Sequence, residues 1–432
     1  MIDKLNTCLL NDSFPPLIDG VANTIQNYAK VLTDNDDNAT VVVPDHPDAK
    51  DEYNYDVVRY KSFPTTKLVG YRAGYPFSAS VLEELEHKNF DIIHTHCPFM
   101  STVIARMLRE RVNIPVVFTY HTKFDIEIKR IIKGKKLQEK VISTVVKNIA
   151  SCDEVWAVSN GAADNLRELG YTGDIVIMPN GIDFPKGEAA KETVDNIINL
   201  HSIDESKPIY LFVGRLRWYK GIKEIIDGLK ILNDNNRDFT MIFIGKGEDQ
   251  EEMQEYTKKL GLDKKCKFIG SVNDREILRG YYTLADLFIF PSSYDTFGLV
   301  VREAAACGTA SMLVKNSCAA EGVSDNINSF LVDETGESVG QKLLEIGDNK
   351  ELLSEVGKNA QETLYVSWED SVKWARSRYN EIIQKYESGD TNRRKSRSDE
   401  FIDAIDEICD NISSFRDYRE KVINFIIGGI QK

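Results

Sequence analysis

The chain has 432 residues, of which 42% are hydrophobic and 28% charged, the composition of a globular protein with two or three domains. The formal net charge of −14 argues against nucleic acid as the main partner, and no apolar run is long enough to span a bilayer. The seven cysteines have no paired spacing, and the first residues lack the layout of a signal peptide, so we expect reduced thiols in a cytoplasm.

Short β-branched runs alternate with helical patterns along the chain. Strands are predicted near 5–10, 40–44, 57–61, 91–96, 115–120, 154–158 and 174–178, and then near 208–213, 240–244, 266–269, 286–290, 310–314 and 329–332. Helical patterns lie between most of them, for example at 20–33, 136–150, 219–232, 248–260, 298–307 and 337–346. This alternation is typical of parallel sheets with helices on both faces.

The predicted strands are too numerous for one ordinary doubly wound domain. Their pattern breaks in the polar stretch 185–207 and restarts at "KPIYLFVGRL". We therefore expect an α/β protein with two facing Rossmann-like domains, at 1–185 and 186–366. Ligands of open α/β sheets bind beyond the carboxyl ends of the strands, so a shared site is predicted in the cleft between the domains.

The end of the chain departs from this layout. Residues 367–386 have the pattern of an amphipathic helix, which we expect to pack back on the N-terminal domain. Residues 387–432 are predicted to form a polar linker and a helical tail, in which Ile423, Ile426, Ile427 and Ile430 recur at helical spacing. Packing or oligomerisation is the expected role of this tail, and membrane association is the alternative.

The stretch "PSSYDTFGLVVREAAACG" places a helix directly after an apolar strand. Phe297, Gly298 and Leu299 would present free backbone N–H groups at the positive end of that helix, where a phosphate binds well. Glu303 lies further along the helix and can accept two hydrogen bonds from a ribose diol, while Asp295 can meet sugar hydroxyls. Together these groups fit a nucleotide sugar, and the alternative is a solvated helix end with an exposed glutamate.

Two more strand ends carry groups that suit the same ligand. In "FVGRLRWYKG", Arg215 and Lys220 follow a strand and can hold a diphosphate, although surface cations paired with glutamates are the alternative. In "IGKGEDQ", Gly245 opens a Gly-X-Gly turn that can bring backbone close to a ligand, a weak signal by itself.

The first half of the chain offers a glycine and a histidine. Gly20, after Asp19, would let backbone approach a phosphate, unless Asp19 is simply a helix N-cap. His121 ends the strand of "VVFTYHT" and is expected to point into a cleft, and the alternative is a hydrogen-bonded polar residue without a role in binding. "DIIHTHCPF" carries His94, His96 and Cys97, but no second ligand cluster accompanies them, so we expect no metal.

These stretches together resemble retaining glycosyltransferases of family 4, which have the GT-B fold. The matching pieces run in family order over most of the chain: "PPLIDGV", "DIIHTH", "TYHT", "MPNGID", "FVGRLRWYKG", "IGKGE" and "PSSYDTFGLVVREAAACG". The resemblance implies that domain 1–185 binds the acceptor and domain 186–366 the nucleotide sugar. It also implies a hexosyltransferase that needs no metal and no other cofactor.

The resemblance also assigns roles to residues. It implies that Glu303 holds the ribose, that Asp295 lies near the donor sugar and that Arg215 and Lys220 bind the diphosphate. Gly20 would approach the diphosphate through its backbone, and His121 would contact the sugar. Asp295 stands where the family motif has glutamate, and Asp19 stands where the family usually has the first of two glycines.

The acceptor is predicted to be a membrane lipid, because the sequence looks most like the branch that glycosylates diacylglycerol in bacteria. In support, residues 123–147 hold eight Lys or Arg and three Asp or Glu, interleaved with apolar residues such as Ile128, Ile142 and Val145, and such a segment can rest on anionic lipid. The alternative is a solvated helix face that covers a core. We expect a cytoplasmic protein, peripheral on the inner face of the plasma membrane, that uses UDP-glucose or UDP-galactose. The alternatives are a soluble or polysaccharide acceptor, a GT-B epimerase or phosphorylase, and a non-catalytic nucleotide-sugar-binding subunit.

Overall fold

The computed structural model describes residues 2–17, 19–64, 72–76 and 78–389. The chain forms two compact units. Of the described residues, the N-terminal unit comprises those up to Val158, Ala162–Met178 and those from Val372 to 389, and the C-terminal unit comprises Ser159–Gly161 and Pro179–Ser371. The polypeptide thus passes between the units near Met178 and again near Val372, and sequence analysis predicted the first boundary at 185 and 186.

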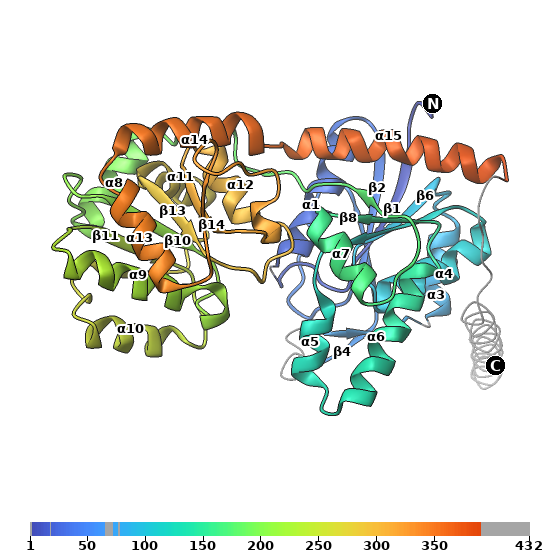
Figure 1. Ribbon diagram of the computed structural model, residues 1–432. Coiled ribbons are helices and arrows are strands. Elements are labelled where there is room, and N and C mark those ends of the chain that lie inside the picture. Colours follow the sequence, from blue (N-terminus) through green and yellow to red (C-terminus); the bar gives the residue numbers. More distant parts are fainter. Residues whose placement is uncertain (1, 18, 65–71, 77, 390–432) are drawn as a thin grey trace, which may run out of the picture. The chain divides into compact units, whose positions relative to one another are not determined.

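The N-terminal unit is built on a seven-stranded parallel sheet (Figure 1). Its strand order is β3-β2-β1-β6-β7-β8-β9. The strands are β1 (Asn6–Leu10), β2 (Asn38–Pro44), β3 (Asp56–Tyr60), β6 (Ile92–Thr95), β7 (Val116–Tyr120), β8 (Glu154–Ala157) and β9 (Val176–Ile177). The strand predicted at 174–178 is therefore only two residues long. Two further strands that the sequence did not predict, β4 (Ser62–Phe63) and β5 (Ala73–Gly74), form an antiparallel pair.

Helices cover this sheet because their apolar faces match its buried strands. They are α1 (Gly20–Asp34), α3 (Ala79–Glu86), α4 (Met100–Val112), α5 (Phe124–Ile131), α6 (Lys135–Ala150) and α7 (Asn160–Glu168). One core cluster packs side chains of α3 and α4 against β1, β2, β3, β6 and β7. Helices α5 and α6 project from the rest of the unit as a pair (Figure 1).

The C-terminal unit repeats the plan with six parallel strands in the order β12-β11-β10-β13-β14-β15. They are β10 (Ile209–Val213), β11 (Thr240–Ile244), β12 (Cys266–Gly270), β13 (Leu287–Phe290), β14 (Ser311–Val314) and β15 (Phe330–Val332). Every residue of β10, β11 and β13 is buried, as expected for central parallel strands covered on both faces.

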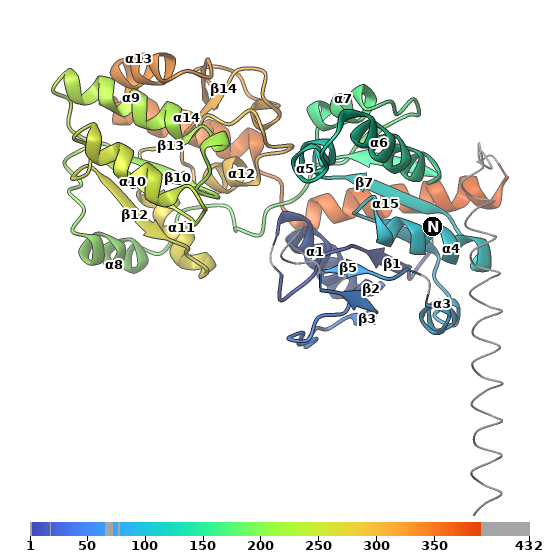
Figure 2. The same cartoon turned by 90° about the horizontal axis from the view of Figure 1, so that it is seen from below.

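The helices of the C-terminal unit lie on both faces of this sheet. They are α8 (Lys191–His201), η1 (Trp218–Lys220), α9 (Ile222–Asp234), α10 (Gln250–Lys259), α11 (Arg275–Leu284), α12 (Leu299–Ala306), η2 (Cys318–Ala320), α13 (Gly336–Ile346) and α14 (Lys350–Leu364). Helices α9 and α13 pack together on one side, and α8 and α11 on the other (Figure 2). The single helix predicted at 219–232 is in fact η1 followed by α9.

The predicted C-terminal helix is present as α15 (Trp368–Glu387), and its residues from Val372 onwards belong to the N-terminal unit. Arg376 donates two hydrogen bonds to the buried carboxylate of Asp37, from Nε at 2.5 Å and Nη2 at 2.9 Å. Arg378 makes a second bidentate pair with Glu154, whose shorter N–O distance is 2.7 Å. The predicted linker and helical tail lie, from residue 390 onwards, outside the described residues.

Removing Arg376 should destabilise the N-terminal unit. Asp37 is 3% exposed and, without the arginine, its carboxylate would keep one hydrogen bond from the described residues, donated by the backbone N–H of Leu5 at 2.8 Å. Because an unpaired buried carboxylate is costly, we expect Arg376→Ala to lower the free energy of unfolding by about 2–4 kcal/mol. Urea unfolding followed by circular dichroism measures the change.

The matched control is Arg237→Ala, which breaks the ion pair with Asp348 between side chains that are 51% and 56% exposed. An exposed pair contributes about 0–1 kcal/mol. If both variants lost the same small amount of stability, the Arg376–Asp37 pair would not be what holds α15 in place.

Candidate active site

Three adjacent strands of the C-terminal unit end beside one another and carry the predicted donor-binding residues. Strand β10 pairs with β11 on one side and β13 on the other, all parallel. Their carboxyl ends therefore lie at the same edge of the sheet, where open α/β sheets bind ligands. Arg215 follows β10, Gly245 follows β11, and Asp295 and Gly298 follow β13.

Glycines let these chain ends approach each other more closely than side chains would allow. A Cβ atom on Gly245, whose φ is +138°, would lie 1.8 Å from the carbonyl oxygen of Gly214. A Cβ atom on Gly247 would lie 2.0 Å from the carbonyl oxygen of Leu216. The Gly-X-Gly turn therefore packs its backbone directly against the turn that carries Arg215.

Gly221 brings Lys220 close to the loop after β13. Its φ is +78°, which ends η1 before α9 begins, and a Cβ atom there would lie 2.0 Å from the carbonyl oxygen of Pro291. This close approach is the physical reason why the predicted single helix is interrupted. Lys220 Nζ then donates to Asp295 Oδ1 at 2.6 Å, and Ser292 Oγ donates to Asp295 Oδ2 at 2.8 Å.

Two tyrosines that sequence analysis did not single out surround the lysine. The rings of Tyr219 and Tyr294 lie 4.4 Å apart, one from each loop. The ammonium group of Lys220 lies 5.7 Å from the centre of the Tyr219 ring and 5.3 Å from that of Tyr294. These cation–π contacts fix a cation at the sheet edge, whereas the side chain of Arg215 is exposed there.

Helix α12 begins at this edge, as predicted. Gly298 is its N-cap in the left-handed conformation with φ of +70°, and no side chain caps the helix. Within the described chain, no partner is recorded for the backbone N–H groups of Gly298 and Leu299, which can therefore bind an anion. The backbone N–H of Phe297 likewise has no recorded partner among the described residues, while its side chain is buried, with the guanidinium of Arg302 5.2 Å from its ring centre.

Glu303 lies one turn into α12 and is held by two groups that the sequence did not reveal. Arg275 Nη2 donates to Oε1 at 2.8 Å, and the hydroxyl of Tyr282 donates to Oε2 at 2.9 Å. Arg275 also pairs with Asp183 and stacks 4.2 Å from the ring centre of Phe184, both in the "MPNGIDF" segment. Burial, and then the nearby carboxylate of Glu303, raise the pKa of Tyr282, so its phenol stays a donor.

In the N-terminal unit, Asp19 caps α1 and Gly20 is exposed as its first residue. Asp19 Oδ1 accepts hydrogen bonds from the backbone N–H groups of Val21 and Ala22, both at 2.8 Å, and Oδ2 accepts one from Ser13 Oγ at 2.7 Å. The carboxylate thus occupies the helix start that Gly20 was predicted to open to a phosphate.

His121 belongs to a buried histidine cluster at the ends of β6 and β7. His96 Nδ1 and His121 Nε2 lie 2.9 Å apart, and their rings are stacked. His94 is bonded on both sides, through Nδ1 to the hydroxyl of Tyr379 at 2.5 Å and through Nε2 to Thr119 Oγ1 at 2.7 Å. Burial lowers the pKa of all three histidines, to about 3 for His121, so the cluster is neutral at physiological pH.

The histidine–cysteine stretch does not form a ligand set. Across the residues that the structure describes, no group of three or more His, Cys, Asp and Glu side chains is placed to hold a metal ion.

Comparison with known proteins identifies the family. Residues 18–185 match the domain family described as Glycosyltransferase Family 4, and residues 194–363 match Glycosyl transferases group 1. The chain belongs to glycosyltransferase family 4. It is an enzyme family, so the sheet edge described above lies in the catalytic fold of a glycosyltransferase.

Several curated relatives of this glycosyltransferase are known by their activity. Alpha-monoglucosyldiacylglycerol synthase of Acholeplasma laidlawii is 24% identical over 367 residues, which are 82% of this chain and 91% of the relative. The enzyme of the same name from Streptococcus pneumoniae is 24% identical over 70% of this chain and 69% of its own length. The GDP-mannose-dependent alpha-mannosyltransferase of Corynebacterium glutamicum is also 24% identical, over 77% and 78%.

Solved structures confirm the predicted GT-B fold. HepE of Anabaena, in complex with UDP and glucose, superposes with a TM-score of 0.69 at 17% identity, over 87% of this chain and 99% of HepE. Sucrose-phosphate synthase of Thermosynechococcus elongatus gives a TM-score of 0.70 at 18% identity, over 88% and 100%.

Acidification should destabilise the glycosyltransferase through its buried histidines. In the unfolded chain each histidine takes up a proton near its ordinary pKa of about 6.5, whereas the folded cluster stays neutral. The unfolded state therefore binds more protons below that pH. Each buried histidine should lower the free energy of unfolding by up to about 1.4 kcal/mol per pH unit between about pH 6.5 and pH 5, and by nothing above about pH 7.5.

Urea unfolding at pH 8, 7, 6 and 5 measures this slope. His121→Asn should reduce the slope by the equivalent of one proton. A free energy of unfolding that stayed constant from pH 7 to pH 5 would show that the histidines are not buried in the neutral form.

Proposed function

We propose that this protein transfers a hexose from a UDP-sugar, UDP-glucose or UDP-galactose, to the hydroxyl group of a membrane lipid such as diacylglycerol, with retention of anomeric configuration. The observation that carries the proposal is the convergence of Lys220, Asp295 and the uncapped start of α12 at the ends of β10 and β13. The names of the diacylglycerol-glycosylating relatives and the UDP and glucose bound to HepE support the choice of ligands.

The diphosphate is the part of the donor that this edge fits best. Lys220 and Arg215 supply positive charge, and the backbone N–H groups of Gly298 and Leu299 supply the positive end of a helix dipole. Such groups stabilise the charge that develops on the leaving UDP and do so without a metal ion. Asp295, held by Ser292, is then placed to accept hydrogen bonds from hydroxyls of the sugar.

Glu303 is proposed to bind the ribose. Each of its carboxylate oxygens receives one recorded hydrogen bond, so each retains a lone pair for a ribose hydroxyl. Arg275 compensates the negative charge of Glu303, which makes the buried carboxylate tolerable at 9% exposure.

The reaction is proposed to occur on one face of the sugar. The bond from the anomeric carbon to the diphosphate oxygen breaks as the bond to the acceptor oxygen forms, and the leaving phosphate takes the proton of the acceptor hydroxyl. No carboxylate nucleophile is required in this scheme, and the protein acts by stabilising charge and by positioning the reactants. The contacts of Gly20 with the diphosphate and of His121 with the sugar stay predictions.

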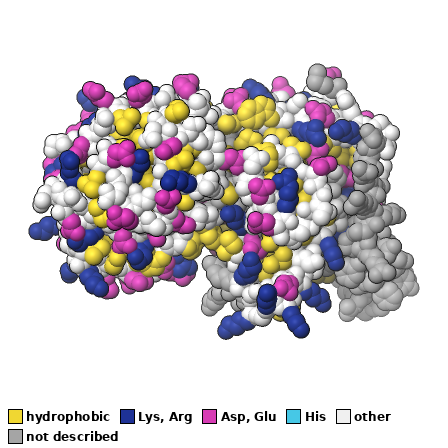
Figure 3. Space-filling model, in the orientation of Figure 1, with side chains coloured by type: hydrophobic (Ala, Val, Ile, Leu, Met, Phe, Trp, Pro, Cys, Tyr) yellow, Lys and Arg dark blue, Asp and Glu magenta, His cyan; other side chains and the backbone are white. Residues whose placement is uncertain are grey.

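The pair of helices α5 and α6 supports a lipid acceptor through its charge. Dark blue side chains gather at the lower end of the N-terminal unit, where these helices lie (Figure 3). The exposed lysines here are Lys129, Lys133, Lys135, Lys136, Lys140 and Lys147. Ile128, Ile142 and Val145 are buried, as in the alternative of a helix face that covers a core, while Leu137 is 53% exposed. We therefore propose electrostatic, peripheral binding to the inner face of the plasma membrane.

No helix of the described residues is long and apolar enough to cross a membrane. A soluble or polysaccharide acceptor stays the alternative, and the net charge of −14 favours it because an acidic protein is repelled by an anionic bilayer.

Substitutions at Lys220 and Glu303 test the donor site. Without an acceptor, the wild-type enzyme should slowly hydrolyse a UDP-sugar, which is measured as released UDP by ion-exchange chromatography. Lys220→Met should lower turnover about 10²- to 10³-fold, because it removes charge that stabilises the leaving group. Glu303→Gln should raise the KM for the donor about tenfold, because a charged acceptor for the ribose hydroxyls is lost.

Lys223→Met is the matched control, since Lys223 lies one turn away and pairs with Asp227 on the exposed surface of α9. It should leave both constants unchanged. If Lys220→Met and Glu303→Gln altered neither donor KM nor turnover, the donor site would have been assigned to the wrong edge of the sheet.

Liposome flotation tests the basic helices. Phosphatidylcholine vesicles should capture the protein only when they contain phosphatidylglycerol. Replacing Lys133, Lys135, Lys136 and Lys140 with glutamine should lower the partition coefficient about 10²- to 10³-fold, at about 1 kcal/mol for each lysine. The control removes four exposed lysines of the C-terminal unit, Lys258, Lys259, Lys264 and Lys358. Equal losses in the two quadruple variants would mean that the charge on α5 and α6 has no special role.

A further inference from the structure

The antiparallel pair β4 and β5 forms a small ribbon whose two faces differ. Ser62 pairs with Gly74 and Phe63 with Ala73, and the backbone N–H of Tyr75 donates to the carbonyl oxygen of Lys61 at 2.7 Å. Because side chains alternate along a strand, Ser62 and Gly74 share one face. Lys61, Phe63 and Tyr75 share the other.

The face of Ser62 and Gly74 is turned to the rest of the N-terminal unit. A Cβ atom on Gly74 would lie 2.3 Å from the ring of the buried Tyr60, so only glycine allows the ribbon to lie this close. Ser62 Oγ donates to the backbone carbonyl of Asp45 at 2.5 Å, and Arg72 Nε donates to Ser62 Oγ at 2.7 Å. These contacts fix which face of the ribbon points outward.

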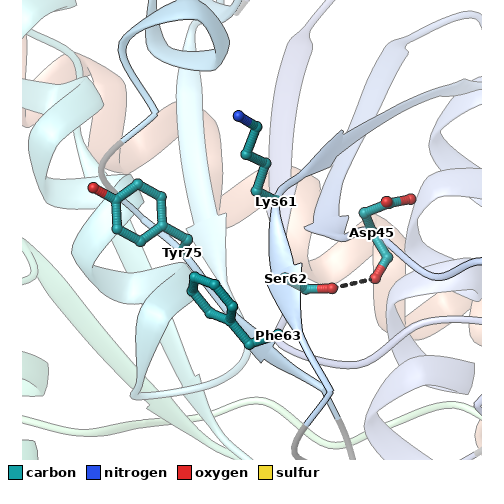
Figure 4. Close-up of a pocket in the computed structure, with 5 residues that line it drawn as sticks. All are labelled: Asp45, Lys61, Ser62, Phe63 and Tyr75. Carbon is teal, nitrogen blue, oxygen red and sulfur yellow. Dashed lines mark hydrogen bonds between the residues drawn. The ribbon is translucent and has the colours of Figure 1, made fainter.

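The outward face is aromatic and hollowed. Phe63 is 57% exposed and Tyr75 is 39% exposed, with ring centres 6.1 Å apart and planes at 83°. A cavity of about 270 Å³ is lined by these two rings together with Asp45, Lys61 and Ser62 (Figure 4). Phe63 and Tyr75 project from one side of β4, as Lys61 does, and Asp45 lies on the other side next to Ser62, which donates to its backbone carbonyl (Figure 4).

Two charged groups of the cavity are available to a ligand. Both Lys61 and Asp45 are exposed, and neither the ammonium of Lys61 nor the carboxylate of Asp45 has a recorded partner in the described part of the chain. An ammonium donates up to three hydrogen bonds and a carboxylate only accepts. Hydroxyl groups satisfy both, and the apolar C–H face of a pyranose ring suits an aromatic ring.

We propose that this cavity binds a pyranose ring that the acceptor already carries. It lies after β2 and β3, at the same carboxyl edge of the N-terminal sheet as His121, which follows β7. Acyl chains would need a longer and wholly apolar groove. The inference rests on the proposed function and deepens it, because it names the acceptor as glycosylated rather than bare.

The test compares two acceptors that share one lipid anchor, diacylglycerol and monoglucosyldiacylglycerol, in the same mixed micelles with the full-length enzyme. Phe63→Ala should raise the KM for the glycosylated acceptor about three- to tenfold and leave turnover unchanged. It should not alter the KM for diacylglycerol or donor hydrolysis. Phe63→Trp should retain wild-type values, and Leu200→Ala, at a position 76% exposed in the C-terminal unit, should change nothing.

The inference is overturned if Phe63→Ala raises the KM for both acceptors equally, which would indicate a contact with the micelle. It is also overturned if the substitution raises the KM for neither acceptor. Saturation-transfer NMR with methyl glucoside tests the sugar-binding cavity independently of the proposed transferase function. Signals in the wild type that disappear in Phe63→Ala support a sugar site even if the protein releases no UDP. Equal signals in both proteins, or no signal in either, would exclude a sugar site that depends on Phe63.

Discussion

The close packing of three strand ends is the constraint on which the proposed donor site depends. Gly245 and Gly221 each stand where any Cβ atom would overlap a backbone carbonyl, of Gly214 in one case and of Pro291 in the other. With larger residues the loops after β10, β11 and β13 would be forced apart, and Lys220 would lose its 2.6 Å contact with Asp295. The charged groups proposed to act at this edge can therefore converge only because the backbone packs so closely there.

The contact between Lys220 and Asp295 has a consequence for donor binding. The cation proposed to hold the diphosphate is already neutralised by a carboxylate, so a bound diphosphate must share Lys220 with Asp295 or replace it. Replacement would release the carboxylate toward the sugar, coupling recognition of the phosphates to recognition of the hexose. An aspartate reaches less far than the glutamate of the family motif, and the support from Ser292 and from the rings of Tyr219 and Tyr294 keeps it close to the lysine.

The sequence predicted the helices and strands that have a periodic apolar pattern, and the candidate site residues that directly follow a strand. Fully apolar runs predicted the central strands, and glycines and charged residues directly after them indicated the edge that is proposed to bind the donor. The contacts of Arg275 and Tyr282 with Glu303 were not predicted, because both residues lie on α11 and are distant from Glu303 in the sequence. Local sequence patterns do not reveal such contacts. The β4–β5 ribbon was not predicted because a strand of two residues is too short to show a periodic pattern. Its proposed role also depends on the close packing of Gly74 against Tyr60, which is a tertiary contact. In residues 123–147 the sequence showed which residues are basic, but not that most of the apolar ones face the core.

The distribution of charge connects the proposed donor and membrane functions. The chain carries a net charge of −14, yet residues 123–147 hold an excess of five basic residues over acidic ones. An anionic bilayer repels most of such a surface and attracts one part of it, so binding through α5 and α6 would also set the orientation of the N-terminal unit on the membrane. Ile128 and Ile142 are buried in the core, and Leu137 is the only large apolar side chain that is exposed on these helices among the described side chains. Attraction through the lysines would therefore be reversible and sensitive to salt. Reversible binding suits an enzyme whose donor is dissolved in water and whose proposed acceptor lies in the bilayer.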